Sequence, residues 1–373
     1  MNEQDRRAWA YLSRVAEPPC PSLATLVAQV GAIDAAARIK ADHIDQDLRE
    51  RVEARRELDC AKTDLDVLDR MGGRLITSAD EEWPLLSFAA FGNVTRSHGH
   101  PPLVLWAAGP LRLDDIAARA AAIVGTRAAT SYGEHVSADL AAGLVDREIA
   151  VVSGGAYGID GAAHRAALGC EGATLAVVAG GIDNPYPSGH AALFRRIRED
   201  CLLVSEYPPG TAPGRLRFLT RNRLVAALSG ATVVVEAGLR SGAANTASWA
   251  KALGRPVCAV PGPVTSAASA GCHALLRQRH VNLVTRACEV VELVGHIGEL
   301  APDQPHPGGP LDELSAEEKR VHDALPGRGG RTVDEIAVAA GMPLHAVLGP
   351  LAMLEVAGLA SGEAGTWRRR RRR

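Results

Sequence analysis

The middle of the chain carries five short apolar runs, each of which ends at or next to glycine. Unbroken β-branched runs of this length are typical of buried parallel strands. Ligands of open α/β sheets bind just beyond the carboxyl ends of such strands, where glycine lets a ligand approach the backbone. The pattern therefore predicts a ligand crevice at the strand ends. The runs end at Gly125, at Gly154 and Gly155, at Gly180 and Gly181, at Gly238, and at Gly262.

Short strands alternate with amphipathic helices over residues 73–298. This alternation predicts an α/β domain, Rossmann-like and doubly wound, with a mainly parallel sheet. Residues 1–72 instead have apolar positions at helical spacing among alanine, arginine and acidic residues, which predicts a small helical N-terminal domain. A SAM-like or helix-hairpin-helix-like DNA contact and a plain packing module both fit this segment.

The C-terminal part of the chain predicts a linker and a further domain. Residues 299–313 are rich in proline and glycine and are interpreted as the linker. Residues 314–367 contain three short helical segments, a glycine-containing turn and two strand-like segments, which predicts a winged-helix domain. Its third helix carries no lysine or arginine, so protein contact fits it at least as well as DNA contact. Six arginines follow as a basic tail at 368–373.

Composition and charge narrow the function classes. The seven cysteines are scattered and never form C-x-x-C, so we expect neither a disulfide framework nor a metal site, and no cofactor. The start of the chain lacks a signal-like pattern and no apolar run approaches a membrane span, so we expect a cytoplasmic protein without a membrane partner. The net charge is −2, and without the tail about −8, so a nucleic acid would need a local basic site.

The first glycine loop, Gly125-Thr126-Arg127, joins a strand to a predicted helix. Backbone N–H groups at a helix start favour an anion, and an arginine beside them adds a fork for phosphate. A dinucleotide site would place three spaced glycines here. Their absence argues against a nicotinamide cofactor.

The second glycine loop allows close backbone approach, and its serine and tyrosine are able to bond phosphate, sugar or base. We expect Asp160 to cap the following helix or to orient a donor, because a bare carboxylate would repel phosphate. His164, one turn later, resembles an acid-base partner, but no nucleophile stands beside it and a structural role is favoured. The candidate contacts in this loop are Ser153, Gly154, Gly155, Tyr157 and Gly158.

Four arginines occur within residues 215–223. Arginine suits forked phosphate recognition, and the phenylalanine among them offers a face to a base. A charge run is usually a solvated helix face, but this one lies between Pro213-Gly214 and an apolar helix, which holds it at the edge of the sheet. The candidate contacts are Arg217, Phe218, Arg221, Asn222 and Arg223.

The fourth strand is followed by a loop that leads into another helix. Ser241 and Gly242 stand at the start of that helix and are candidate DNA contacts because its N-terminus faces the same crevice. Glu236 is expected to brace a loop arginine or backbone N–H groups, and together with Asp160 and His164 it is assigned to support of the pocket. None of the loops presents a nucleophile, a metal cluster or a positioned acid, so no catalytic residue is assigned.

In this order, these motifs resemble the DNA-processing protein A (DprA, also called Smf) family of bacteria. The resemblance covers the whole α/β domain and extends to the helical N-terminal region and the winged helix. The residues that carry it are Ile-Val-Gly-Thr-Arg at 123–127, Ser-Gly-Gly-Ala-Tyr-Gly-Ile-Asp-Gly-Ala-Ala-His at 153–164, Tyr186-Pro187, Ser205-Glu206-Tyr207-Pro208, Arg221-Asn222-Arg223, Val-Glu-Ala at 235–237, Ser241-Gly242 and Ala259-Val260-Pro261-Gly262.

The resemblance implies a protein that binds single-stranded DNA, shields it from nucleases and helps load the RecA recombinase during transformation or recombination. It also implies a homodimer formed through the α/β domain, and phosphate contacts at Arg127, the 153–158 loop, Arg221 and Arg223. Two positions depart from the family pattern: many relatives have arginine where Tyr157 stands and proline where Leu219 stands. The tyrosine either weakens the phosphate grip or replaces it by stacking on a base.

Two other function classes remain open. A nucleotide-processing phosphoribohydrolase of the lysine-decarboxylase-like fold has a similar glycine-rich loop followed by a helical glutamate. Residues 242–251 contain no acidic residue, so the expected catalytic carboxylate is missing. A scaffold that acts mainly through protein contacts is the third class.

Overall fold

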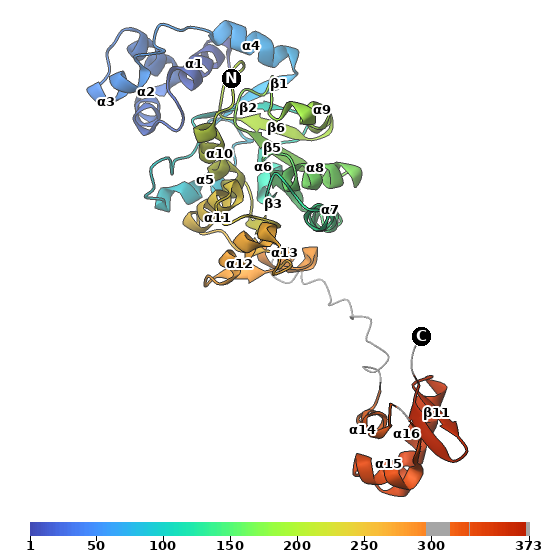
Figure 1. The fold of residues 1–373 in the computed structure, drawn as a ribbon. Helices are drawn as coiled ribbons and strands as arrows, with labels where there is room; N and C mark the ends of the chain where they lie inside the picture. The colour runs from blue at the N-terminus through green and yellow to red at the C-terminus, as the bar shows by residue number, and fades with distance from the viewer. Residues whose placement is uncertain (296–313, 328, 371–373) are drawn as a thin grey trace. The chain divides into compact units, whose positions relative to one another are not determined.

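The computed structural model describes residues 1–295, 314–327 and 329–370. The chain forms two compact units, Met1–Leu300 and Ala301–Arg373, each of which is described by itself (Figure 1). The predicted linker at 299–313 and the last three arginines lie outside the described residues.

The first unit is built on a nine-stranded sheet with the strand order β1-β2-β6-β5-β4-β3-β7-β8-β9. Strand β2 runs antiparallel to both of its neighbours, β1 and β6, and all other neighbouring strands of this sheet pair in parallel. The order reverses between β3 and β7, which is the switch point of a doubly wound sheet. The predicted α/β class is confirmed. The strands are β1 (Gly73–Thr77), β2 (Val104–Ala108), β3 (Ala120–Val124), β4 (Ala150–Ser153), β5 (Thr174–Val178), β6 (Leu202–Ser205), β7 (Ala231–Val234), β8 (Val257–Ala259) and β9 (Val281–Leu283).

The five glycine-ended runs of the sequence form β3, β4, β5, β7 and β8. The pattern did not mark β6 as a further central strand. Strand β6 ends at Ser205-Glu206 and has no glycine at its tip, so a rule based on glycine passes over it although all four of its residues are buried.

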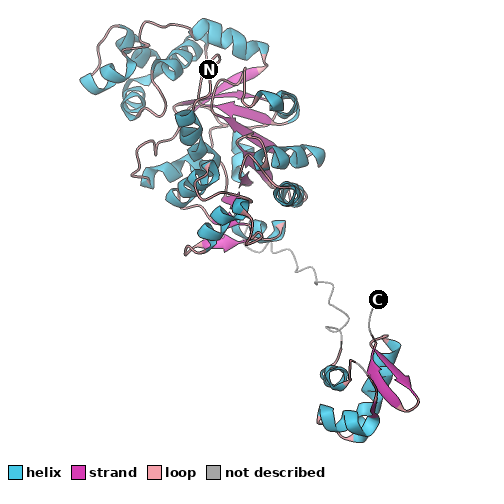
Figure 2. Ribbon diagram, in the orientation of Figure 1, coloured by secondary structure: helices cyan, strands magenta, loops and turns pink. Residues whose placement is uncertain are grey.

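Helices cover both faces of the sheet, as the cyan and magenta layers of Figure 2 show. Alternate strand residues point to opposite faces, so Val152 packs with α10 and α11 while Val151 packs with α7, α8 and α13. The helices of the α/β part are α5 (Leu85–Ala89), α6 (Leu113–Ala118), α7 (Ser131–Val145), α8 (Ile159–Gly169), α9 (Ala191–Asp200), α10 (Arg215–Ala227), α11 (Gly242–Ala252), α12 (Ala270–Leu276) and α13 (Ala287–Val294).

The N-terminal segment is helical, and it packs on the β1-β2-β6 side of the sheet. Tyr11 and Leu12 share one apolar cluster with Trp106 of β2 and Leu203 of β6. The N-terminal helices and the sheet therefore share one core here. That residues 1–72 form a domain of their own stays a prediction. The helices are α1 (Glu3–Val15), α2 (Pro21–Lys40), α3 (Gln46–Val52) and α4 (Ala61–Arg70).

Helix α2 is by length and composition apolar enough to cross a membrane, and so are α15 (Val333–Ala340) and α16 (Leu344–Val356) of the second unit, taken as one pair bent by 102°. This differs from the expectation that no apolar run approaches a span. Helix α2 is broken at Gly31, whose φ of 80° is non-helical. Its buried residues, Leu23 and Ile39 among them, belong to the cluster that packs on the sheet. Such packing is what a core helix of a folded domain requires.

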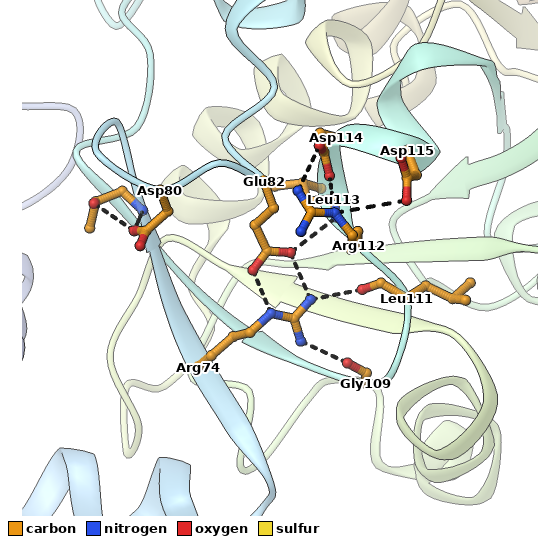
Figure 3. A network of polar contacts seen from close by, with 10 residues as sticks. Arg74, Asp80, Glu82, Gly109, Leu111, Arg112, Leu113, Asp114 and Asp115 are labelled. Carbon is orange, nitrogen blue, oxygen red and sulfur yellow. Dashed lines mark hydrogen bonds and ion pairs between the residues drawn. The ribbon is translucent and has the colours of Figure 1, made fainter. Parts of the chain in front are cut away.

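An ionic network fixes the antiparallel edge of the sheet to the connection after β2 (Figure 3). Arg74 of β1 donates to both carboxylate oxygens of Glu82, at 2.5 and 2.8 Å, and to the carbonyls of Gly109 and Leu111. Glu82 also accepts the N–H of Leu113 at the start of α6. Nearby, the exposed Arg112 forks onto Asp114. This network lies at the end of the sheet opposite the carboxyl ends of the parallel strands.

The second unit is a winged helix, as predicted. Ser315 and Thr332 head capping boxes with Glu318 and Glu335, which explains where its first two helices begin. A three-stranded sheet completes it. The elements are α14 (Ala316–Ala324), β10 (Arg331–Thr332), α15 (Val333–Ala340), α16 (Leu344–Val356), β11 (Ala360–Glu363) and β12 (Thr366–Arg369).

The predicted boundary between winged helix and basic tail needs a correction. Arg368 and Arg369 belong to β12 and pair with Ser361 and Ala360 of β11. The guanidinium of Arg369 donates to the carbonyls of His322 and Asp323 at the end of α14. Strand pairing therefore includes the first two arginines of the run in the domain.

Candidate nucleic-acid interface

A cleft of about 560 Å³ opens at the carboxyl ends of the parallel strands, beside the switch point between β3 and β7. The loop after β3, the loop after β4, the start of α10 and the start of α11 form its walls. The residues that line it are Val124, Gly125, Thr126, Arg127, Gly154, Ala156, Asp160, Tyr186, Pro213, Gly214, Arg215, Phe218, Leu219, Arg221, Asn222, Val225, Ser241, Gly242, Ala243 and Thr246.

Arg221 forms part of the cleft wall and is only 5% exposed. Its Nη1 donates to the carbonyl of Val177 at the end of β5, at 2.5 Å. Its guanidinium packs so closely on Gly154 that a Cβ atom at that position would collide with it. Burial lowers the pKa of Arg221 to about 10, which still leaves it charged at neutral pH. A buried guanidinium beside a glycine loop is a strong phosphate donor because little water screens it.

Asp160, in the first turn of α8, balances this charge. Its carboxylate accepts the N–H groups of Gly154 and Ala156 at 3.2 and 3.4 Å. Burial raises the pKa of Asp160, although the nearby Arg221 acts in the opposite direction. The Asp160 side chain thus fixes the backbone of the second glycine loop, and it is assigned to support of the cleft rather than to ligand contact.

An aromatic and cationic group that includes Arg221 lines the cleft. The guanidinium of Arg127 lies over the ring of Phe218, 5.0 Å from its centroid, and that of Arg221 lies 6.0 Å from the same centroid. Tyr186 meets Phe218 edge to face at 5.8 Å. Arg127 and Arg215 are exposed at the rim. The cleft therefore presents cations for phosphate and ring faces for a base within one wall.

The N-terminus of α11 completes the cleft. Ser241 caps it by accepting the N–H of Ala244 at 3.3 Å. Asn222 of α10 donates to the Gly242 carbonyl and to Asn245 Oδ1, at 3.3 and 3.1 Å. Asn222 therefore ties the arginine-rich helix to α11, and the unpaired N–H groups at the start of α11 face the cleft with their positive dipole end.

Glu236, after β7, holds the first glycine loop. Its carboxylate accepts the hydroxyl and the N–H of Thr130, at 2.6 and 2.9 Å. Its backbone carbonyl accepts the N–H of Thr126 at 2.7 Å. The glutamate thus braces backbone and threonine groups rather than an arginine. Among the described residues no group of three or more His, Cys, Asp or Glu side chains is placed to hold a metal ion.

Comparisons with known proteins show which family the chain belongs to. The family model for DNA recombination-mediator protein A (DprA) matches residues 74–295, which is more than half of the chain. The chain belongs to this family. The model for the DprA winged helix domain matches residues 304–366. The family model covers the strands and loops that build the cleft.

Individual relatives agree with the family. The chain is 65% identical over 371 residues to a protein of Mycobacterium tuberculosis named DNA processing protein DprA, with 99% of this chain and 95% of that protein covered. It is 37% identical over 262 residues to protein Smf of Escherichia coli, with 67% and 68% covered. The X-ray structure of DprA from Streptococcus pneumoniae superimposes with a TM-score of 0.65 at 28% identity, over 79% of this chain and 99% of that one.

A further DprA structure, from Helicobacter pylori, matches with a TM-score of 0.50 at 26% identity over 59% of this chain and 94% of that one. It is described as revealing a single-stranded DNA binding mode of that protein.

Six predicted contacts of this DprA family member are absent from the cleft lining, and three of these have side chains that are paired elsewhere: Ser153, Arg217 and Arg223. Ser153 is buried and its hydroxyl donates to the Ile123 carbonyl at 2.7 Å. Arg223 is fully buried in an ion pair with Glu206, with Nη2 and Oε1 2.6 Å apart. Arg217 turns toward the N-terminal helices and binds Glu17. Ser153 and Arg223 are therefore corrected as DNA contacts because they are buried with their partners, whereas Arg217, which is only partly buried, is corrected only as a contact of this cleft.

The rest of the second loop shapes the cleft from behind. Gly155 and Gly158 have φ values of 71° and 72°, which favour glycine. Tyr157 is 44% exposed but packs edge to face on His190 outside the lining. His164 is buried, its Nδ1 lies 2.7 Å from the Thr174 hydroxyl, and burial lowers its pKa to about 3. A histidine that stays neutral in this way serves packing rather than proton transfer.

Several side chains in the lining were not among the predicted contacts, and the larger ones among them are Tyr186, Arg215 and Leu219. Tyr186 had a usable signal, since Tyr186-Pro187 is one of the family motifs, and Arg215 belongs to the arginine run. The sequence does not distinguish Arg215 from Arg217. The two lie on different sides of α10, and only the folded structure shows that the side with Arg215 faces the cleft.

Proposed function

We propose that this protein binds single-stranded DNA in the cleft as a step in DNA processing for recombination or natural transformation. Its backbone phosphates contact Arg127, Arg215 and Arg221, and a base contacts the ring of Phe218. The bound strand is shielded from nucleases and passed to a RecA-type recombinase. The protein acts in the cytoplasm by binding, not as an enzyme.

One observation carries the proposal: Phe218 holds two guanidinium groups over its ring at the same strand ends where two glycine loops and a helix N-terminus converge. Phosphate is bound by arginine forks and N–H groups, and unpaired bases are bound by aromatic faces. In a duplex the bases are stacked on one another, so no base face is free to contact an aromatic ring of the protein. The single-stranded DNA binding mode described for the Helicobacter pylori relative supports the same ligand class.

Family membership supports the proposed partners. A RecA-type recombinase and a second copy of this chain are what the DprA resemblance implies. Strand β9 is at the edge of the sheet, and its Leu283 is exposed. An unpaired strand edge with an exposed apolar side chain is suited to pairing with a second copy.

Arg127→Ala tests the cleft directly. Arg127 is exposed, so its loss leaves the fold intact and removes one phosphate contact. We expect the affinity for oligothymidylate to fall about tenfold. The slope of log K against log salt should become shallower by about 0.7, the value for one phosphate of a single strand.

Arg112→Ala is the matched control. It removes the same charge from an exposed side chain at the opposite end of the sheet, where Arg112 pairs with Asp114 (Figure 3). Electrophoretic shift assays of both variants over a range of salt concentrations measure the affinity and its salt dependence. Equal losses in the two variants would mean that the net charge, not the cleft, binds DNA.

A further inference from the structure

The N-terminal helices and the α/β sheet meet at an ion pair that has the form of an oxyanion site. Arg217, in the first turn of α10, grips the Glu17 carboxylate with Nε at 2.6 Å and Nη2 at 2.9 Å. Arg55, after α3, donates to the same carboxylate at 2.8 Å. Two guanidinium groups from different parts of the chain thus converge on one pair of oxygens, which is how arginines bind a phosphate.

A separate pocket of about 190 Å³ lies beside this pair and is lined by Arg55 and Arg217, but not by Glu17. Arg14 also lines it, but its guanidinium is already held by Asp64, at 2.7 and 2.8 Å, and by the Pro209 carbonyl. Tyr207 lines it as well, under the guanidinium of Arg217, 5.1 Å from the ring centroid.

The Tyr207 hydroxyl is buried and has no hydrogen-bond partner among the described residues. The oxygen is closed off from solvent, so the ring of Tyr207 and not its hydroxyl contributes to the pocket wall. The donors beside the pocket are the two arginines that hold Glu17.

The pocket adjoins the DNA cleft through one short segment of chain. Pro213, Gly214, Arg215 and Phe218 line the cleft, whereas Thr211 and Arg217 line the pocket. In the first turn of α10, Arg215 and Phe218 therefore line the cleft and Arg217 lines the pocket. Arg217 also donates to the Ala212 carbonyl at 2.7 Å, so the segment at 211–214 lies between the two sites.

We propose that Arg55 and Arg217 form a second phosphate subsite for single-stranded DNA beside this pocket, and that the Glu17 carboxylate engages their N–H donors until a DNA phosphate takes its place. The inference rests on the proposed function, because the strand must first be held in the cleft.

The charge of Glu17 fits this role. Burial would raise its pKa, but hydrogen bonds from Arg217 and Arg55 outweigh that effect and the pKa is lowered. Glu17 is therefore ionised at neutral pH and competes with phosphate for the same donors. Its side chain is 45% exposed, so it has room to swing out when a phosphate arrives. A short strand confined to the cleft leaves this ion pair untouched.

The test compares Glu17→Gln with the native chain over oligothymidylates of increasing length, using the full-length protein. The amide is neutral and no longer competes for the two arginines. Strands too short to leave the cleft should bind both proteins equally. Longer strands should bind the variant about two- to fivefold more tightly, which corresponds to loss of a partly exposed ion pair.

Asp59→Asn is the matched control, because it makes the same charge change in another exposed ion pair of the helical segment, with Lys40. A double-mutant cycle with Arg217→Ala isolates the pair. Arg217→Ala should weaken only the longer strands and abolish the gain from Glu17→Gln. Thermal unfolding of each variant checks that the fold is kept.

The length dependence separates this inference from the proposed function. If short strands bind and Glu17→Gln gives no gain on long strands, or only the gain that Asp59→Asn gives, the second subsite is refuted and the cleft stands. If short and long strands gain equally, the carboxylate acts on the cleft itself and the subsite is again refuted. If native protein binds no strand of any length, both proposals fail.

Discussion

Two arginines on α10, Arg221 and Arg223, stand two residues apart and have different surroundings. Arg221 faces the cleft, whereas Arg223 donates to Glu206 and to the His98 carbonyl and lies over the ring of Phe91. Arg223 and Glu206 are both buried, and burial raises the pKa of Glu206 in spite of its partner. The arginine therefore stabilises the fold by compensating a carboxylate that cannot reach water.

Arg223→Ala is expected to lower the free energy of unfolding by about 3–5 kcal/mol, because it leaves the Glu206 carboxylate buried without its partner. Urea denaturation measures this loss. The double variant Glu206→Leu with Arg223→Met should recover most of it, since it removes both charges at similar volume. A single variant as stable as the native chain would contradict the role assigned to the pair. Replacement of Arg221 and Arg223 together would thus test stability as well as DNA binding.

At the scale of one element, helix α10 shows what a sequence pattern is able to predict. The sequence placed the arginine run around Phe218 between Pro213-Gly214 and an apolar helix, and in the structure the run and that helix form one helix, α10. A helix turns by about 100° per residue, so Arg223 lies about 200° around α10 from Arg221, whereas Arg217 and Arg221, four residues apart, lie on nearly the same side. The packing partners distinguish the three arginines: Arg217 binds Glu17, 200 residues away in the sequence, and Arg223 binds Glu206, 17 residues away.

Phe218→Ala is expected to weaken single-stranded DNA binding by about 1–3 kcal/mol, the contribution of one stacked base. The salt slope should stay unchanged, because no phosphate contact is removed. This distinguishes Phe218 from Arg127, whose loss makes the slope shallower. Titrations by fluorescence anisotropy at several salt concentrations measure both quantities.

The control for this element is Phe218→Tyr, which keeps the ring face and should bind as the native chain does. A slope change in Phe218→Ala as large as that in Arg127→Ala would mean that the ring only positions the arginines that lie over it.

At the scale of the whole molecule, the alternation of strands and helices was enough to predict the doubly wound sheet and the winged helix. The strand order was not readable, because neighbours such as β3 and β7 are separated by more than a hundred residues. The shared core of helices and sheet was equally hidden, since Trp106 and Leu12 meet only in the folded chain. Local periodicity encodes elements, whereas the junctions between them depend on long-range packing.

The winged-helix unit presents an apolar rather than a basic recognition helix. Helix α16 contains no lysine or arginine, and the cations of this unit are concentrated in the arginine run that begins in β12. The exposed apolar side chains of α16 are Leu344, Leu348, Met353 and Val356. Direct base reading by α16 is therefore not expected, and nucleic-acid contact of this unit would come from arginines that bind either form of DNA.

A chain that ends at Gly295 separates the two sources of affinity. It keeps the cleft, which takes unstacked bases, and loses the C-terminal arginines, which attract any phosphate backbone. We therefore expect its preference for single-stranded over duplex oligonucleotides to be larger than that of the full chain, through weaker duplex binding at low salt. Shift assays of both proteins on both forms of DNA give the two ratios. A truncated chain that binds the two forms equally would refute the cleft as a single-strand site, whereas a full chain with the larger ratio would assign the preference to the second unit.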